Sequence, residues 1–326
     1  MDSSSQEREG KKKLPEVKTF PVPFTLGEIK ENITVNTNTP SKPSEEELIN
    51  QAIKLHVAGN IQEASKYYQY FINQGFKDYR VFSNYGLILK DLGKLQEAEK
   101  LQRKAIELNP DFAQAHSNLG GILNDLGNLK EAEISTRKAI ELNPQVAIAH
   151  SNLGNILKDL GNLKDAEISQ RKAIELNPQL AIAHLNLGII LSDLGRLKEA
   201  ELSTRKSIEL NSDFADAHLN LGCVLKDLGR LKEAELSTRK AIKLNNGSAI
   251  AHSNLGFILL SQEKLDDAAY SFQKAIKLRQ NHSPAIGGLG KVFMKQGNHL
   301  EGIKKLREGY GSIIFDYIST TMNICS

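Results

Sequence analysis

A histidine recurs every 34 residues along the middle of the chain, and its type raises the question of a metal site or a general base. The series is His116, His150, His184, His218 and His252. Equivalent residues in stacked helical units lie about 10 Å apart, whereas each ligand of a zinc ion must come within about 2.1 Å of it. We therefore expect histidines that pack and hydrogen-bond within the protein, and no metal site.

An asparagine series with the same interval points to a different chemistry. Its members are Asn84, Asn118, Asn152, Asn186, Asn220 and Asn254. An asparagine amide both donates and accepts, so one side chain can satisfy the N–H and C=O of a bound main chain. About three residues of extended chain, at roughly 3.3 Å each, cover the roughly 10 Å between units. The series therefore predicts a groove for extended peptide, and the alternative is that these amides bond to neighbouring helices.

An aspartate series follows the first five asparagines by seven residues, in the last turn of the same expected helix. Its members are Asp91, Asp125, Asp159, Asp193 and Asp227. A negative charge there opposes the helix dipole by about 0.3–1 kcal/mol, so a positive partner is expected. The structural candidates are Lys130, Lys164, Lys198 and Lys232. The functional candidate is a basic or polar stretch of ligand, which places Asp125, Asp159, Asp193 and Asp227 in the predicted groove.

The remaining reactive residue types form no catalytic constellation in the sequence. Cys223 and Cys325 are too far apart for metal-ligand spacing, and Cys223 has no sequence context of a nucleophile. The Gly120-Gly121 pair lies in an expected helix rather than in a strand-to-helix phosphate loop. We therefore expect no catalytic residue, no cofactor and no enzymatic activity.

The elements that carry these series are units of 34 residues. A unit of two short helices cannot bury its apolar face alone, so stability must come from stacking in an elongated solenoid. We expect the solenoid over residues 45–312. Its eight units are 45–78, 79–112, 113–146, 147–180, 181–214, 215–248, 249–282 and 283–312.

Each unit reads as a helix, a glycine stop and a second helix. The first helix ends at a glycine such as Gly127, which can adopt a left-handed conformation. In the second helix Glu133 precedes Arg137 by four residues, the favourable order for an ion pair. The same acid-to-arginine spacing recurs in other units: Glu99 and Arg103, Glu167 and Arg171, Glu201 and Arg205, Glu235 and Arg239.

These features resemble the tetratricopeptide repeat family. The matching residues are Asn118-Leu119-Gly120, Gly127, Ala132, Ala139 and Pro144, and the departures are His116, Leu123 and Thr136 at positions where the family often has large aromatic residues. The resemblance implies an all-α fold, a right-handed α-solenoid of about eight helix-turn-helix repeats, whose first helices line the concave wall. The asparagine series is similar to that of protein O-linked N-acetylglucosamine transferase superhelices, which hold substrate backbone.

The family's clamp for a terminal carboxylate needs a lysine directly after the first aromatic position. Ser117, Ser151, Leu185 and Ser253 stand there instead. The sequence therefore argues against binding of chaperone tails of that kind.

The two ends of the chain differ from the units. Residues 1–44 are polar and proline-rich with a basic run at Lys11, Lys12 and Lys13, which predicts a disordered arm. Residues 313–326 are expected to be irregular. The apolar Ile313, Ile314 and Phe315 could pack back on the last unit, mediate self-association, or precede a further domain.

Composition narrows the classes of partner. The chain has 326 residues and a net charge of +3, with 42 basic and 39 acidic residues interspersed. Nucleic acid and membranes are therefore not expected partners. With two cysteines, no apolar segment long enough to span a bilayer and no signal-peptide pattern, a cytoplasmic location is expected.

The sequence thus predicts a non-catalytic scaffold that binds a partner protein or extended peptide, of basic or polar character, in a concave groove. The alternative is a substrate-recruiting or truncated part of a protein-modifying transferase, of the N-acetylglucosamine or sulfotransferase type.

Overall fold

The computed structural model describes residues 44–311, 313–316 and 321–324. The predicted disordered arm at 1–44 therefore lies, apart from Ser44, outside the described residues. Sixteen helices occupy the described part of the chain, and these are α1 (Glu45–Val57), α2 (Ile61–Asn73), α3 (Tyr79–Asp91), α4 (Leu95–Leu108), α5 (Ala113–Asp125), α6 (Leu129–Leu142), α7 (Ala147–Asp159), α8 (Leu163–Leu176), α9 (Ala181–Asp193), α10 (Leu197–Leu210), α11 (Ala215–Asp227), α12 (Leu231–Leu244), α13 (Ala249–Ser261), α14 (Leu265–Leu278), α15 (Ser283–Lys295) and α16 (His299–Tyr310).

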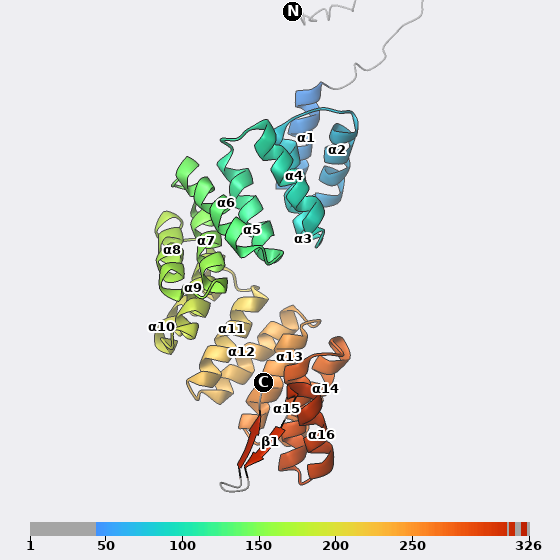
Figure 1. Cartoon of the computed structure of the whole chain (residues 1–326), viewed down its shortest axis with the longest axis vertical. Coiled ribbons are helices and arrows are strands. Elements are labelled where there is room, and N and C mark those ends of the chain that lie inside the picture. The colour runs from blue at the N-terminus through green and yellow to red at the C-terminus, as the bar shows by residue number, and fades with distance from the viewer. Residues whose placement is uncertain (1–43, 312, 317–320, 325–326) are drawn as a thin grey trace, which may run out of the picture.

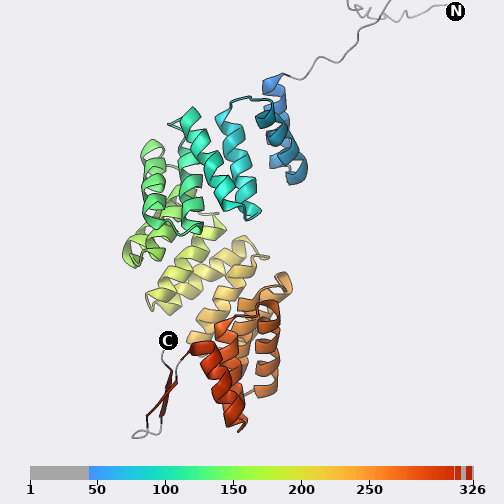
Figure 2. The same ribbon diagram turned by 45° about the vertical axis from the view of Figure 1, so that its right-hand side comes forward.

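The helices stack as antiparallel pairs in single file, from α1 to α16 (Figure 1). Each odd-numbered first helix packs on the even-numbered second helix of its own unit, and that second helix packs on the next first helix. The expected α-solenoid of helix-turn-helix repeats is therefore confirmed. Turning the view by 45° shows the same succession of pairs (Figure 2).

The first helices form the inner wall of the stack. Successive first helices contact one another directly, from α3 with α5 to α13 with α15, whereas second helices pack chiefly on first helices. In a curved stack the elements on the inner side come closest together. We call the surface made by the first helices α3 to α13 the inner wall, and the surface made by the second helices the outer face.

The turn between the helices of a unit requires a left-handed residue. Gly127 has a φ of 80° there, as the sequence predicted, and equivalent glycines behave alike. The unit that starts at Ala249 differs, because Glu263 occupies this position with a φ of 60°. A side chain in this conformation costs about 1–2 kcal/mol.

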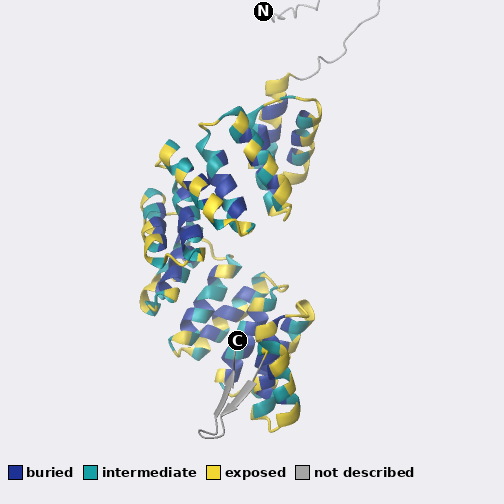
Figure 3. Ribbon diagram, in the orientation of Figure 1, coloured by how far each residue is buried: buried dark blue, intermediate teal, exposed yellow. Residues whose placement is uncertain are grey.

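Small residues let the two helices of a unit approach closely. Ala132 and Ala139 have no exposed surface, and a methyl group added at Gly120 would overlap the Thr136 hydroxyl. Burial follows the inner contacts of every pair, while the rims stay exposed (Figure 3).

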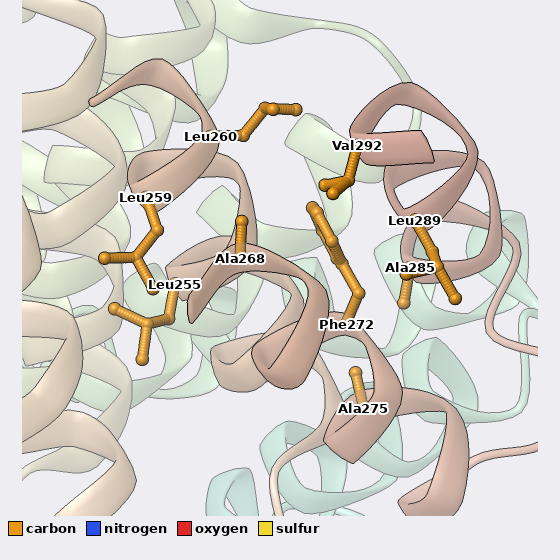
Figure 4. Packing of buried hydrophobic residues seen from close by; sticks show 9 residues of the cluster. All are labelled: Leu255, Leu259, Leu260, Ala268, Phe272, Ala275, Ala285, Leu289 and Val292. Carbon is orange, nitrogen blue, oxygen red and sulfur yellow. The ribbon is translucent and has the colours of Figure 1, made fainter. Parts of the chain in front are cut away.

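The position of Thr136 holds an aromatic ring in the unit that starts at Ala249. Phe272 is fully buried there, between the side chains of α13 and α15, and its ring reaches toward Val292 (Figure 4). In the middle units this position is polar but equally buried. The residues concerned are Gln102, Thr136, Gln170, Thr204 and Thr238.

The end of the chain corrects one expectation. Residues 313–326 were expected to be irregular, but β1 (Ile313–Asp316) pairs antiparallel with β2 (Thr321–Ile324), and Ile313 lies opposite Ile324. The run of β-branched and aromatic residues in β1 favours the extended conformation over an irregular one. Among the described helices none is long and apolar enough to cross a membrane.

Candidate functional site

The six asparagines occupy one position on the inner wall, in α3, α5, α7, α9, α11 and α13. Asn118 donates through Nδ2 to Ser83 Oγ of the preceding unit at 3.1 Å, and Asn186 makes the same bond to Ser151 at 3.3 Å. Both asparagines are 8% exposed. We call the six residues the asparagine ladder.

Three further members of the ladder, Asn152, Asn220 and Asn254, also donate a hydrogen bond from Nδ2 to other residues of the protein. Asn152 donates to both the carbonyl and the hydroxyl of Ser117, each at 3.2 Å. Asn220 donates to Thr204 Oγ1 at 2.8 Å, and Asn254 to Cys223 Sγ at 3.1 Å. The sequence left open whether these amides bind peptide or bond to neighbouring helices. The structure shows that the nitrogen atoms bond to neighbouring helices.

The asparagine oxygens are placed differently. Asn118 Oδ1 accepts from Gln114 Nε2 at 2.9 Å. No donor among the described residues reaches Oδ1 of Asn152, Asn186, Asn220 or Asn254, and none of these oxygens is sealed from solvent. Four acceptors therefore remain along the inner wall, one for each successive unit.

Buried glutamines of the second helices hydrogen-bond the serines that accept from the ladder asparagines. Ser83 donates to Gln102 Oε1 at 2.9 Å while Gln102 Nε2 donates to the Ser83 carbonyl at 2.8 Å. Ser151 and Gln170 repeat this arrangement at 3.0 and 2.8 Å. Sequence reasoning missed these serine and glutamine residues, although their 19-residue separation recurs.

Asn84 lies at the first position of the ladder, beside the first unit. Burial raises the pKa of the Tyr68 hydroxyl to about 12, and a side-chain hydrogen bond with Asn84 acts in the opposite direction. Tyr68 also lies 3.3 Å from His56 Nδ1. The first rung is thus set beside aromatic side chains of the first unit.

The aspartates lie at the end of the inner wall, and their partners differ from those expected. Asp125 pairs with Lys90 of the preceding unit at 3.3 Å, and Asp227 pairs with Lys226 at 3.2 Å. Asp159 pairs with Lys158 and accepts from Asn124 at 3.2 Å. The expectation that Lys130, Lys164, Lys198 and Lys232 compensate these charges was therefore wrong for these three, because lysines in the last turn of the same or the preceding first helix lie within reach instead. Asp193 has no cationic partner among the described residues.

The ninth position of each unit varies in residue type along the inner wall. Gly121 faces Lys90 Nζ and Asn152 Nδ2 across a space that would admit a methyl group. Later units place Ile189, Cys223 and Phe257 at this position. Lys291 lies over the Phe257 ring at 5.9 Å, and burial raises the pKa of the Cys223 thiol. The first three units of the inner wall hold Leu87, Gly121 and Asn155 there, so the three later units are uniformly less polar than Asn155 but not than Leu87.

Four of the five histidines serve the expected structural role. Nε2 of His116, His150 and His184 lies 2.9–3.0 Å from the carbonyl of Pro110, Pro144 and Pro178 respectively. His218 makes the same contact to Ser212 at 3.0 Å. His252 differs, since its Nε2 is buried with no hydrogen-bond partner. Within the described ranges no group of three His, Cys, Asp or Glu residues could hold a metal ion.

The outer face carries the predicted ion pairs and a set of hollows. Arg137 contacts Glu133 at 2.8 Å, and the four other predicted pairs also form. Hollows lie between successive second helices, including one of ≈ 540 Å³ bounded by Arg103, His116 and Ile134. Sequence reasoning placed no site on this face.

Comparison with known proteins identifies the class of repeat. Models described as tetratricopeptide repeats match more than half of the chain, at residues 86–127, 113–146, 147–180, 170–201, 215–247 and 249–282. The chain belongs to the tetratricopeptide repeat family. No curated protein sequence matches it significantly.

Solved structures share the fold. The chain is similar to the Cut9–Hcn1 hetero-tetramer of the APC/C (17% identity, TM-score 0.69, over 82% of this chain and 52% of that one), so it spans about half the length of that match. It is also similar to TTC0263, a tetratricopeptide repeat protein of Thermus thermophilus (23% identity, TM-score 0.52, 56% and 100% covered). YrrB, a TPR protein with an unusual peptide-binding site, aligns with a TM-score of 0.44 at 27% identity over 57% and 95%.

Proposed function

We propose that the protein is an interaction scaffold whose inner wall binds extended segments of partner proteins. The asparagine oxygens that have no donor accept N–H groups of the ligand main chain, while the asparagine nitrogens hold the rungs in place. The aspartates at the end of the wall favour ligands with basic or polar side chains. The tetratricopeptide fold shared with Cut9, which assembles with Hcn1, supports a role in protein interaction.

One observation carries this proposal, namely four acceptors repeated at the spacing of the units. Asn152, Asn186 and Asn220 each fix their nitrogen on the preceding unit and keep Oδ1 accessible. A pre-ordered acceptor loses little entropy when a ligand binds. Each hydrogen bond contributes only about 0.5–1.5 kcal/mol, so binding depends on engaging several units together.

The test must block the wall without breaking the bonds between units. Gly121→Phe places a ring on the wall at a residue where an added Cβ meets only ordinary contacts, and it removes no hydrogen-bonding side chain. Ile134→Phe is the matched control, because Ile134 is 70% exposed on the outer face of the same unit. A library of short peptides is captured on each purified variant and sequenced.

The proposal expects Gly121→Phe to lose most bound peptide and Ile134→Phe to keep it, with both variants equally helical. A second variant neutralises Asp125, Asp159, Asp193 and Asp227 to asparagine and is expected to lose the preference for basic peptides. Equal capture by all variants would remove the inner wall as the binding surface.

The same wall would serve the alternative role of recruiting substrates to a protein-modifying transferase. That role requires sugar or sulfate transfer to proteins in a cell lysate that depends on added chain. Its failure would leave the binding proposal intact.

A further inference from the structure

In the last turn of the second helices, one position changes from glutamate to lysine near the C-terminal end of the solenoid. In four successive units a lysine pairs with a glutamate three residues later. The pairs are Lys104–Glu107 at 2.7 Å, Lys138–Glu141 at 3.0 Å, Lys172–Glu175 at 2.6 Å and Lys206–Glu209 at 2.7 Å. In α12 and α14 the glutamate position holds Lys243 and Lys277.

This reversal leaves cations without partners. Lys240 contacts Asp213 of the preceding loop at 3.5 Å instead. Within the described ranges no carboxylate lies within 4.0 Å of the side-chain nitrogen of Lys243, Lys274 or Lys277. A lysine in the last turn gains about 0.3–1 kcal/mol from the helix dipole, which accounts for tolerance of these residues. Of these three lysines, Lys243 also lines a hollow on the outer face.

A hollow of ≈ 400 Å³ lies between α12, α13 and α14 on the outer face. Lys243 and Arg239 bound one side, while Ile242, Leu255 and Tyr270 give it an apolar wall. Tyr270 is 69% exposed, so this wall is open to a partner.

The equivalent hollow between α4 and α6 is lined by two glutamates, Glu107 and Glu131. Glu107 stands there in place of Lys243, and Arg103 hydrogen-bonds across the hollow to Glu131. In the later hollow Asp267 replaces that glutamate and is one methylene shorter. Arg239 consequently pairs only with Glu235 of its own helix, at 2.9 Å, and makes no ion pair with Asp267 across the hollow, while Lys264 at the start of α14 joins Glu235 at 3.0 Å.

His252 lies in the floor of this hollow with an unsatisfied polar atom. Its side chain is 8% exposed and its Nε2 has no partner at hydrogen-bond geometry, unlike the histidines of the four preceding units. Burial lowers the pKa of the imidazole, the Asn246 carbonyl opposes this effect, and the positive charge of Lys274 lowers the pKa further. Because Nε2 is sealed from solvent, the imidazole forms part of the floor, and Arg239 and Lys243 supply the positive charge at the edge of the hollow.

We propose that this hollow binds an acidic segment of a partner protein that carries one apolar or aromatic anchor residue. The carboxylates of the segment pair with Lys243 and Arg239, and the anchor side chain packs on Leu255 and Tyr270. Glu235 and Asp267 keep the net positive charge of the hollow small, which disfavours a polyanion such as RNA. The site is separate from the inner wall, so the scaffold has two surfaces of opposite charge preference.

The chain provides its own matched variants for the test. Lys243→Glu recreates the lysine–glutamate pair that four upstream units already contain, so it is not expected to unfold the protein. Glu209→Lys makes the reverse change one unit earlier, where the hollow is bounded by Arg205, His218 and Leu236. Short random peptides are captured on each protein, and a selected acidic peptide is then titrated by fluorescence anisotropy.

The wild type is expected to enrich peptides in which Asp or Glu flank a Leu, Phe or Trp. The selected peptide should bind Lys243→Glu about tenfold more weakly or worse, as expected for reversing one charge at a close pair, and Glu209→Lys should bind it at least as well as the wild type. Absence of acidic enrichment, or equal affinity for Lys243→Glu, would overturn the proposal. Binding of an RNA oligonucleotide in place of peptide would also overturn it.

Discussion

Asn118 and Ser83 join two successive units through a hydrogen bond of 3.1 Å between Nδ2 and Oγ. The serine hydroxyl donates its own proton to Gln102 Oε1, so one asparagine ends a chain of bonds that begins in the second helix of the preceding unit. Asn118 thus links two units through its nitrogen, while its amide oxygen lies on the inner wall. We call this link the joint.

The joint predicts a measurable coupling between the two residues. Asn118→Ala and Ser83→Ala should each destabilise the protein, and a double-mutant cycle from urea unfolding should give a coupling of about 1 kcal/mol. Asn118→Ala combined with Ser151→Ala is the control, since those side chains do not meet. Additive effects in both cycles would contradict the joint.

Adjacent glycines in α5 should respond in opposite directions to the same substitution. Gly120→Ala forces a methyl group into Thr136 and against the Ala132 carbonyl, and should cost about 1–3 kcal/mol. Gly121→Ala meets only ordinary contacts and gains helix propensity, so it should stabilise by about 0.5–1 kcal/mol. Thermal unfolding of both variants measures the two effects. Equal effects would contradict the close packing of α5 on α6 at Gly120.

Glu263 should be a site of stored backbone strain. Its φ of 60° costs about 1–2 kcal/mol for a residue with a side chain, and its exposed pair with Lys295 returns about 0.2–1 kcal/mol. Glu263→Gly should therefore raise the free energy of unfolding by roughly 0.5–1 kcal/mol. The reverse change, Gly229→Glu at the equivalent turn, should lower it, and a gain in stability there would refute the argument.

Glu201 should make the stability depend on pH in the acid range. Burial raises its pKa, but hydrogen bonds from Arg205 and Arg230 outweigh burial and hold the pKa below the usual 4.5. The folded state thus favours the charged form, and this stabilisation is complete above pH 4.5 and is lost as pH falls through the folded pKa. Glu201→Gln should unfold at a lower temperature than the wild type at neutral pH, with the difference vanishing in acid.

Glu141→Gln is the control for this titration, because Glu141 lies on the surface with a 70% exposed side chain. It should follow the wild type across the same pH range. A constant difference between Glu201→Gln and the wild type would exclude the network as its source.

The 34-residue period made most of the fold predictable. It placed the glycine turn at Gly127, the pair of Glu133 with Arg137 and the contact of His116 with a carbonyl, because each depends on residues close in sequence. It also placed the asparagines on one face.

The 34-residue period could not show which amide atom of each asparagine bonds within the protein and which stays available to a ligand. Asn118 lies within reach of Ser83, 35 residues earlier, only because of how two helices cross, and spacing does not contain that angle. Lys243 was also missed, because a search for recurring residues overlooks the place where a recurring charge is broken. The β1–β2 hairpin lies outside the period altogether.

The central claim is that an extended peptide lies along the inner wall. The most direct measurement places a photo-crosslinking residue on that wall and maps where it reacts with a selected bound peptide. A benzoylphenylalanine replaces Asp125 in one protein, Asp193 two units later in a second, and the outer-face Ile134 in a third, so that the inner-wall probes lie at the end of the wall and leave the asparagine oxygens uncovered. Two units span about 20 Å, or roughly six residues of extended chain. The account predicts adducts from the first two positions at peptide residues about six apart and none from the third. Adducts from position 134 alone, or inner-wall adducts at a single peptide residue, would contradict it.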